Sequence, residues 1–448
     1  MKNKAIILSG LILTATLLLS FTANVFATAT AQEVSLDPAN PVEITFYAYS
    51  IATATEGEAP KGLVHLVNDF NETVGKEKGV HVTAIADTNP DGDSKVRSDI
   101  QAGLPVDVIQ NAFSTLDENR QNYGFSAFED IFPVEAMQSH FDGIFPAAQE
   151  LGKIDGKTYG ISCTLSMPIL YINGTLFREA GLDPEQPLNT WEEVAAAAKT
   201  IKEKLDLPGL GFTTDPGWDM EGAQSLIFTN GGKILSDDRT AAVFADAGIA
   251  DAFKSWKQVY LDGAAALGTQ MEVFQGFAAG KVGMHFISSA VLTTYNGISK
   301  QAGWELYGQP MPGIGDNVAT PVNSGSTLAV RSDSPLKSLA IWEFIQYMTS
   351  DEAYTIIPSE MGYVPLRDNL LDNEAYLKAY ADANPVLRVA TKELETMVPV
   401  TIWPAGAGTE SLAIFNDAVK MAITTDGDTE TIMKDAQDQI TQVLQSVY

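Results

Sequence analysis

Short β-branched and aromatic runs alternate along the chain with longer stretches whose apolar residues recur at helical spacing. The run Val42–Tyr49 is typical of a buried strand, and residues 62–70 carry four apolar side chains on one helical face. A second strand is predicted over Val80–Ile85. Strand, helix and strand in this order favour an α/β fold with a parallel sheet.

The same patterns predict further elements towards the carboxyl terminus. The clearest is a helix from Trp191 to about Lys204, because Thr190 and Glu193 match a capping box and an alanine-rich stretch follows them. The other predicted elements are a helix ending over Asp99–Gly103, a strand over Val106–Ile109 that ends in Gln110 and Asn111, a hairpin or strand over Lys153–Ser162, an amphipathic segment over Ile249–Leu261, a strand over Val282–Ile287 that Val273–Ala279 precedes, a strand over Thr327–Val330, and helices over Pro335–Met348 and Thr429–Val447.

One stretch of the chain carries an unusually specific order of motifs. From Tyr159 to Glu193 the sequence places YGIS, ILYIN, LFREAGLDPEQP and TWEE in succession. This order resembles the extracellular solute-binding proteins of ABC importers (family 1), in particular the sugar-binding and glycerol-3-phosphate-binding group. The AGLDPEQP turn followed by TW is most similar to the glycerol-3-phosphate-binding component. The resemblance extends from Val42 to the end, with a second anchor at Met361–Pro365.

The resemblance implies a two-lobed α/β fold of the periplasmic-binding-protein type, with a central ligand cleft and a hinge. The length of 448 residues also favours two domains, and no Pro-rich or Ser-rich linker separates them. Several crossing segments are therefore expected between the lobes. We place the amino-terminal lobe at residues 42–162 plus 287–335 and the carboxyl-terminal lobe at residues 163–286 plus 336–448.

The first residues have the three parts of a secretory signal peptide, which we place at residues 1–31. Lys2 and Lys4 precede an apolar run from Ala5 to Phe21, and small residues follow at Ala27, Ala29 and Ala31. The alternative is a retained membrane anchor, which would need about 20 uninterrupted apolar residues. We therefore expect export to the periplasm or to the extracellular face of the membrane.

The net charge and the cysteine content limit the classes of partner and of chemistry that the chain can have. The chain has 28 Lys and Arg against 57 Asp and Glu, a net charge of −29, which argues against nucleic acid or an anionic membrane as a partner. The one cysteine, Cys163, allows no intramolecular disulfide, and its apolar neighbours favour a small buried hydrophobic residue over a reactive thiol. We expect a monomer whose partners are a small ligand and the permease subunits of an ABC transporter.

Candidate ligand residues are sought in the loops after the strands, because open sheets bind ligands at the carboxyl ends of their strands. Aromatic faces suit the C–H faces of a sugar, and hydroxyls or amides suit its hydroxyl groups. Tyr47 is expected in the core rather than at the ligand. Each of three other residues has an alternative to ligand contact. Phe113 could belong to the core, Asn111 could cap a turn, and Trp218 could pack between the lobes. The candidates are Tyr49, Asn111, Phe113, Ser166, Trp218, Ser288, Ser289, Gly325, Tyr363 and Trp403.

The resemblance points to five of these positions and also shows two departures. Ligand residues of the glycerol-3-phosphate-binding group fall on Ser166, on Ser288 or Ser289, on Gly325 and on Tyr363. The acidic residue that follows the family's third strand is Asn111 or Ala112 here, and residues 398–408 lack the expected arginine. Since a phosphate needs a fixed cation or several N–H donors, we predict a neutral carbohydrate or polyol. Glycerol 3-phosphate or a glycerophosphodiester remains the alternative ligand.

Other chemistry has weak support in the sequence. The AGAG run at Ala405–Gly408 lacks the context of a nucleotide site, and DTNPDGD at Asp87–Asp93 lacks the final acidic ligand of a calcium loop, which is Ser98. The four histidines show no paired metal spacing. We expect no metal, no cofactor and no enzymatic activity. A secreted glycan-cleaving enzyme is the second hypothesis, with acidic candidates at Glu56, Glu58, Asp219 and Glu221.

Overall fold

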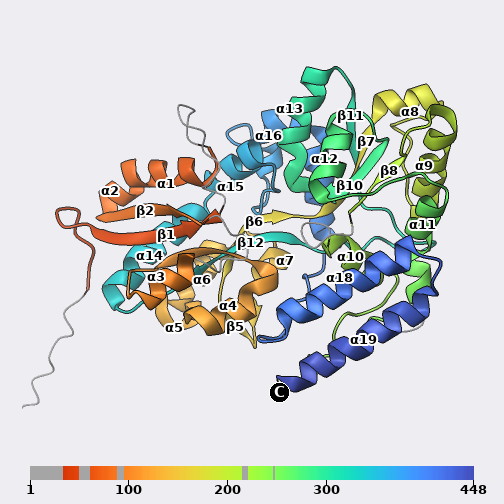
Figure 1. The fold of residues 1–448 in the computed structure, drawn as a ribbon. Coiled ribbons are helices and arrows are strands. Elements are labelled where there is room, and N and C mark those ends of the chain that lie inside the picture. Colours follow the sequence, from red (N-terminus) through yellow and green to blue (C-terminus); the bar gives the residue numbers. More distant parts are fainter. Residues whose placement is uncertain (1–33, 50–60, 88–94, 214–219, 246–247, 448) are drawn as a thin grey trace, which may run out of the picture. The chain divides into compact units, whose positions relative to one another are not determined.

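The computed structural model describes residues 34–49, 61–87, 95–213, 220–245 and 248–447 (Figure 1). The contacts of the chain separate residues 1–35 from a second unit, Leu36–Tyr448, and the description below concerns that second unit. Within the described ranges, every helix is too short or too polar to cross a membrane. The predicted signal peptide, residues 1–31, lies outside these ranges.

The first five-stranded sheet has the order β2-β1-β3-β12-β6. β1 pairs in parallel with β2 and β3, as the strand–helix–strand pattern predicted, whereas β12 runs antiparallel to both β3 and β6. Phe344 of α14 packs edge-on against Phe46 of β1 and Phe70 of α1, so these two helices share the core of this sheet. The bounds are β1 Val42–Ala48, β2 Val80–Ala86, β3 Val108–Ala112, β6 Ile161–Ser166, β12 Ser324–Val330, α1 Leu63–Glu72 and α14 Pro335–Met348.

The second five-stranded sheet has the order β11-β7-β10-β8-β9. Its long central strands β7 and β10 are antiparallel, and Met167 alone separates β7 from β6 of the first sheet. Ile169 and Tyr171 of β7 pack into one core cluster and Leu170 and Ile172 into another, because successive side chains leave opposite faces of a strand. The bounds are β7 Pro168–Asn173, β8 Leu210–Gly211, β9 Ala265–Ala266, β10 Met284–Ser288 and β11 Leu306–Gln309.

Helices and short turns connect these strands, and α18 and α19 pack side by side in Figure 1. The predicted hairpin is present as β4 and β5, with Asp155 and Gly156 at positive φ in its turn. The remaining bounds are β4 Lys153–Ile154, β5 Lys157–Thr158, α2 Val74–Lys78, α3 Lys95–Gln101, α4 Leu116–Tyr123, α5 Phe128–Ile131, α6 Val134–Phe141, α7 Pro146–Glu150, α8 Gly174–Ala180, α9 Trp191–Leu205, α10 Met220–Thr229, α11 Ile249–Leu261, α12 Gln270–Ala278, α13 Leu292–Ala302, α15 Ala353–Ile356, α16 Lys378–Ala383, α17 Pro385–Lys392, α18 Gly408–Thr424 and α19 Thr429–Ser446, with single turns at Phe113–Thr115, Ser289–Val291, Ile357–Met361, Leu370–Asp372 and Glu393–Glu395.

The predicted capping box of α9 is confirmed. The Thr190 hydroxyl accepts from the Glu193 N–H, and the Glu193 carboxylate accepts from the Thr190 N–H. The first residue of the helix, Trp191, then packs edge-on against Trp256 and Phe286, with ring centroids 5.4 and 4.8 Å away. The cap therefore fixes both the start of α9 and the insertion of its first side chain into the core.

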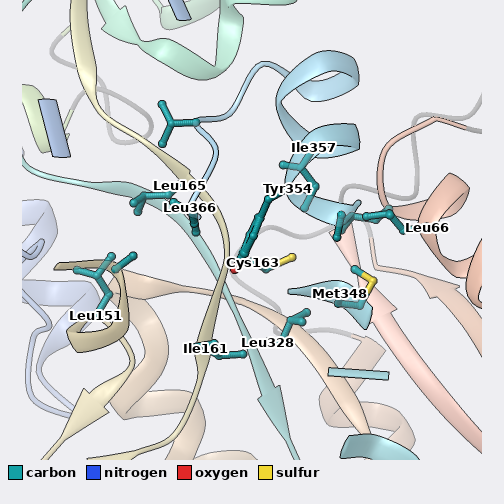
Figure 2. Close-up of a cluster of buried hydrophobic side chains, with 14 of the residues drawn as sticks. Leu66, Leu151, Ile161, Cys163, Leu165, Leu328, Met348, Tyr354, Ile357 and Leu366 are labelled. Atoms are coloured by element: carbon teal, nitrogen blue, oxygen red, sulfur yellow. The ribbon is translucent and has the colours of Figure 1, made fainter. Parts of the chain in front are cut away.

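The centre of β6 passes through the larger core cluster, where Cys163 lies among Leu328, Met348 and Tyr354 (Figure 2). The thiol is fully buried, and this burial raises its pKa to about 12. A thiol with so high a pKa holds its proton at neutral pH and is a poor nucleophile. The prediction that Cys163 acts as a small buried hydrophobic residue is confirmed.

The elements on each sheet differ in part from the lobe boundaries drawn on the sequence. The predicted first lobe included residues 287–335, yet β11 pairs with β7 of the second sheet. The predicted second lobe included residues 336–448, which contain all of α14 except Pro335. This helix, however, packs against β1 of the first sheet. Strand pairing and helix packing are tertiary contacts that the linear pattern does not specify. The division into lobes stays a prediction.

Candidate functional site

One edge of the first sheet gathers most of the predicted ligand residues. β1, β3 and β6 all end at this edge, and β12 begins there because it is antiparallel to its two neighbours. The register places Ser324 opposite Ser166 and Ser326 opposite both Thr164 and Ala112. The chain then passes from β6 into β7, so this edge is also where the first sheet continues into the second.

Four hydroxyl-bearing residues at this edge, Tyr49, Thr164, Ser326 and Tyr363, form what we call the hydroxyl cluster. Thr164 Oγ1 and Ser326 Oγ lie 2.7 Å apart, and both residues are fully buried. The Tyr49 hydroxyl lies close enough to Ser326, and the Tyr363 hydroxyl close enough to Thr164, for each pair to lower the pKa of its tyrosine. Both tyrosines remain partly exposed. The buried Thr and Ser thus hold two tyrosine hydroxyls side by side at the sheet edge.

The protonation of the two tyrosines follows from their surroundings. Burial of the hydroxyl raises the pKa of Tyr49 and that of Tyr363 above the ordinary value for tyrosine, and the proximity of Tyr363 raises that of Tyr49 further. Both groups therefore stay neutral at physiological pH. A neutral phenol both donates and accepts a hydrogen bond, which is the capacity needed to pair with a ligand hydroxyl.

Two serines predicted separately, Ser166 and Ser288, form what we call the serine pair. The Ser288 hydroxyl donates to Ser166 Oγ at 2.8 Å and accepts from the Ala290 N–H at 3.2 Å. Ser289 has a different role, since its N–H donates to the Met167 carbonyl and its Oγ accepts from the Met167 N–H. The structure thus separates the two serines that the sequence left ambiguous, with Ser288 beside Ser166 and Ser289 fixing the junction residue Met167.

Gly325 lies in β12 between the serine pair and the hydroxyl cluster. Its φ of +120° is a conformation that residues with a Cβ rarely adopt, and a Cβ there would lie 2.2 Å from the Thr164 carbonyl oxygen. The β12 backbone can therefore approach β6 this closely only with glycine at the position.

The other predicted ligand residues lie in different surroundings. Asn111 is inside β3 rather than after it, and its amide is bonded to Ala112 and Asn119. Phe113 is 2% exposed within the larger core cluster, which favours the core alternative for this residue. The prediction that Tyr47 is a core residue is confirmed by its 2% exposure. Trp218, the acidic candidates Glu56, Glu58 and Asp219, the Glu221 side chain and most of the Asp87–Asp93 segment lie outside the described residues.

Trp403, the last predicted ligand residue, ends a segment that runs beside the start of β12. Val398 bridges to Val322, and the N–H groups of Val400 and Thr401 donate to Asn323 Oδ1 and Gln224 Oε1 at 2.8 and 3.1 Å. The Trp403 ring is 3% exposed. The sequence analysis did not identify Asn323 and Gln224 as residues near the candidate site. The one signal in the sequence that could have identified Asn323 is its position immediately before the Ser324–Ser326 run.

The segment around residue 401 also lines a cavity of about 450 Å³. Its wall is formed by the β4–β5 hairpin, by residues between Phe228 and Arg239, and by Val400, Thr401 and Ile402. Charged and apolar side chains alternate around it, so it can accept a ligand with polar and apolar faces. Its lining residues are Lys153, Ile154, Asp155, Phe228, Lys233, Ile234, Leu235, Asp237, Arg239, Val400, Thr401 and Ile402.

A buried carboxylate, that of Asp117, pairs with Arg239, one of the residues that line this cavity. Asp117 lies on α4, which packs against β3, and its side chain is 5% exposed. It accepts from Arg120 at 2.6 Å and from Arg239 at 3.0 Å, while Arg239 also donates to the Ile402 carbonyl at 2.8 Å. The two arginines thus balance the buried charge, and Arg239 connects α4 to the segment that carries Trp403.

We expect Asp117→Asn to lower the free energy of unfolding by about 1–3 kcal/mol, because it leaves two partly buried guanidinium groups without their counter-charge. Urea unfolding followed by circular dichroism measures this loss. Asp130→Asn is the matched control, since Asp130 pairs with Lys157 on the exposed surface and should change stability by at most about 0.5 kcal/mol. Equal effects of the two substitutions would contradict the bridging role of Asp117.

Among the described residues, no three His, Cys, Asp or Glu side chains lie close enough together to hold a metal ion. His285, the most deeply buried histidine, is bonded through Nδ1 to the Tyr295 hydroxyl at 2.6 Å. Burial lowers its pKa to about 3, so the ring stays neutral at physiological pH. His285 is thereby explained as a core residue.

Comparison with known proteins finds similarity to bacterial binding proteins. Residues 65–385, well over half of the chain, match the family described as bacterial extracellular solute-binding protein. A binding protein of Brucella abortus is 24% identical over 368 residues, which are 78% of this chain and 82% of that protein. The sn-glycerol-3-phosphate-binding periplasmic protein of Brucella melitensis is 26% identical over 260 residues, which are 54% of this chain and 57% of that protein.

Solved structures share the fold. The cyclic α-maltosyl-1,6-maltose binding protein of Arthrobacter globiformis superposes with a TM-score of 0.77 at 22% identity, covering 91% of this chain and 100% of that one. UgpB from Mycobacterium tuberculosis, solved in complex with glycerophosphocholine, gives a TM-score of 0.73 at 17% identity, covering 91% of this chain and 100% of that one. The predicted fold class, a two-lobed periplasmic-binding-protein-like fold, is confirmed.

Proposed function

The chain belongs to the bacterial extracellular solute-binding protein family, and we propose that it binds a neutral carbohydrate or polyol for an ABC importer. The observation that carries this proposal is the convergence of the hydroxyl cluster and the serine pair at the edge where the first sheet continues into the second. Neutral hydroxyls from Tyr49, Tyr363 and Ser166 can each both donate to and accept from a ligand hydroxyl. We also propose that the protein is exported, that it acts as a monomer, and that it delivers the ligand to the permease subunits in the membrane.

Closure of two lobes over the ligand is the mechanism that this placement supports. β6 and β7 join the sheets through Met167, and residues 310–323 return the chain from β11 to β12. These crossings are the proposed hinge. A ligand that contacts residues of both sheets makes its full set of contacts only when the lobes are closed, so its binding shifts the population towards the closed state.

A phosphorylated ligand is the alternative, since two of the relatives above bind glycerol 3-phosphate or were solved with glycerophosphocholine. The 398–408 segment contains no arginine. Arg239 reaches this segment, but it already donates to Asp117 and to the Ile402 carbonyl. A phosphate would need a cation that is free to form a forked pair with it. This arrangement supports the neutral ligand.

The glycan-cleaving enzyme remains a second hypothesis that assays can test. Its signature would be two carboxyl groups facing each other across the ligand. The members of this family bind and transport solutes, and we propose that this chain likewise leaves its ligand unaltered. A reducing-sugar assay on common glycans should show no turnover. Activity that Glu221→Gln abolishes would overturn the proposal.

Ligand titration followed by tryptophan fluorescence tests the proposed function. We expect a saturable change with at least one of a panel of mono-, di- and trisaccharides and polyols, because Trp403 ends the segment that runs beside the start of β12. Glycerol 3-phosphate and glycerophosphocholine serve as the anionic arm of the panel. No signal from any compound at micromolar to millimolar concentration would contradict the proposal, and a response confined to the anionic arm would favour the alternative ligand.

A further inference from the structure

A buried glutamine contacts the hydroxyl cluster from the central strand of the first sheet. Gln110 lies in β3 and is 2% exposed. Its Nε2 donates to Ser326 Oγ on the neighbouring strand β12 at 3.0 Å. Glutamine is mostly found at protein surfaces, because burial of its amide costs free energy unless hydrogen bonds replace those to water. A glutamine at this position therefore needs an explanation that core packing alone does not supply.

The strand pairing on both sides of β12 brings these groups together. Ser326 lies opposite Ala112, two residues along β3 from Gln110, so the Gln110 and Ser326 side chains leave the same face of the sheet. On the other side, Ser326 lies opposite Thr164, and the register of β12 with β6 shifts directly after this pair, at Thr327. Bulges of this kind re-aim side chains next to binding sites. Ser326 thus receives contacts from both neighbouring strands.

The bond from Gln110 determines how the Ser326 hydroxyl can point. A serine hydroxyl carries one hydrogen, and an amide nitrogen can only donate. Because Gln110 Nε2 donates to Ser326 Oγ, the Ser326 hydrogen is directed away from Gln110, towards its other neighbours Thr164 and Tyr49. Without this donor the hydroxyl would be free to rotate. Gln110 therefore fixes the orientation of the hydroxyl that lies beside Tyr49.

This orientation bears on the part of the hydroxyl cluster that a ligand can reach. Ser326 and Thr164 are fully buried, whereas Tyr49 and Tyr363 remain partly exposed. The two tyrosines are therefore the members that can meet a ligand, and the buried hydroxyls act on the ligand through them. A site whose groups are ordered before the ligand arrives loses less entropy on binding, which increases affinity.

We propose that Gln110 is a positioning residue of the ligand site, which orients the Ser326 hydroxyl and, through Ser326, orders the Tyr49 hydroxyl that meets the ligand. This inference rests on the proposed function, because it takes the hydroxyl cluster as part of the ligand site. Gln110 itself is buried and makes no contact with the ligand. Its effect on affinity therefore depends on the presence of the Ser326 hydroxyl.

A double-mutant cycle in ligand affinity tests this dependence. The probe is the compound of the panel above, with glycerol 3-phosphate and glycerophosphocholine included, that binds the unmodified protein most tightly in calorimetric titration. Ser326→Ala and Gln110→Met each remove one side of the bond, and each should weaken binding about 10-fold. The double variant should also bind about 10-fold more weakly, because the second substitution removes a bond that is already lost. Independent effects would instead multiply to about 100-fold.

Urea unfolding of the same variants separates positioning from a purely structural role. The double variant replaces both partners with apolar groups, and such paired replacements can be nearly neutral for stability. We expect it to unfold at the same urea concentration as Ser326→Ala while it keeps the loss of affinity. If Gln110→Met alone does not fold, the double variant can still be compared with Ser326→Ala. Their affinities should agree within about threefold, and a further loss of about 10-fold would overturn the inference.

Gln309→Met is the matched control, because Gln309 is also a buried glutamine in a strand. It lies in β11, is 9% exposed, and its side chain is bonded to Pro184, Gln186 and Leu188 rather than to the hydroxyl cluster. Its affinity for the probe should stay within about threefold of that of the unmodified protein. A loss as large as that of Gln110→Met would show a general effect of removing buried amides and would overturn the inference.

The outcomes separate this inference from the proposed function. Binding by Gln110→Met within about threefold of the unmodified protein, or a loss of about 100-fold in the double variant, would overturn the positioning role alone. The proposed function would still stand, because the unmodified protein would have bound the probe. Silence of the unmodified protein with the whole panel would overturn both.

Discussion

Gly325→Ala should destabilise the protein by several kcal/mol and abolish ligand binding. The residue has a φ of +120°, where an L-residue carries about 1–3 kcal/mol of backbone strain. The added Cβ would also lie 2.2 Å from the Thr164 carbonyl oxygen. That oxygen belongs to the backbone of β6, which is paired with β12 along its length and cannot move aside alone. The two strands would have to separate, and the hydroxyl cluster would separate with them.

Gly297→Ala is the matched control for this substitution. Gly297 lies inside α13, and a Cβ there would meet nothing within 4 Å. Alanine has the higher helix propensity, so this variant should be neutral or more stable by up to about 1 kcal/mol. Urea unfolding of both variants measures the difference, and titration with the best saccharide measures the loss of binding. A Gly325→Ala protein as stable as the Gly297→Ala protein would contradict the described geometry of β12.

Sequence patterns predicted the elements whose residues strongly favour one kind of secondary structure. The capping box placed the start of α9 at Trp191, and the apolar face of Ile249–Leu261 gave both ends of α11. The start of β12 was missed. Ser324–Ser326 looks like a polar loop before Thr327, but these residues continue the strand, since Ser326 is buried between Thr164 and Gln110 and bonded to both. Hydrophobicity patterns cannot identify polar residues that a neighbouring strand satisfies.

The candidate site was predictable where a residue belongs to a recognised motif. Ser166, Ser288 and Tyr363 were selected individually from such motifs, and the structure brings them to one edge of the first sheet. Their mutual contacts were not predictable, because β12 and β10 meet β6 and β7 only through long-range pairing. The same holds for Gln110, which donates to Ser326, 216 positions away along the chain.

Glu393 is a buried acid on one of the segments that connect the two sheets. It is 6% exposed, and its Oε1 accepts from the Met311 N–H at 3.0 Å, just after β11. Its Oε2 has no partner in the structure. Burial raises the pKa of this carboxyl to about 8, and the bond from Met311 offsets only part of that rise. Glu393 is therefore protonated in the folded protein at neutral pH and ionised in the unfolded chain.

Glu393→Gln should stabilise the protein at pH 8 and have little effect near pH 4.5. Between the unfolded pKa of 4.5 and the folded pKa of about 8, the folded state holds a proton that the unfolded chain releases. The free energy of unfolding therefore falls as pH rises through this window, by about 1.4 kcal/mol per unit and about 4 kcal/mol in all. Glutamine keeps the oxygen that accepts from Met311 and carries no charge at any pH, so the difference between variant and unmodified protein isolates this group.

Urea unfolding of the two proteins at pH 5, 6, 7 and 8 measures the effect, and the stability difference should widen steadily towards pH 8. Glu395→Gln is the control, because Glu395 is exposed on the same helical turn and should leave the pH dependence unchanged. A constant difference across the range would mean that Glu393 ionises in the folded protein. The packing of its turn against the loop after β11 would then have to admit water, and this crossing segment would be less rigid than its burial implies.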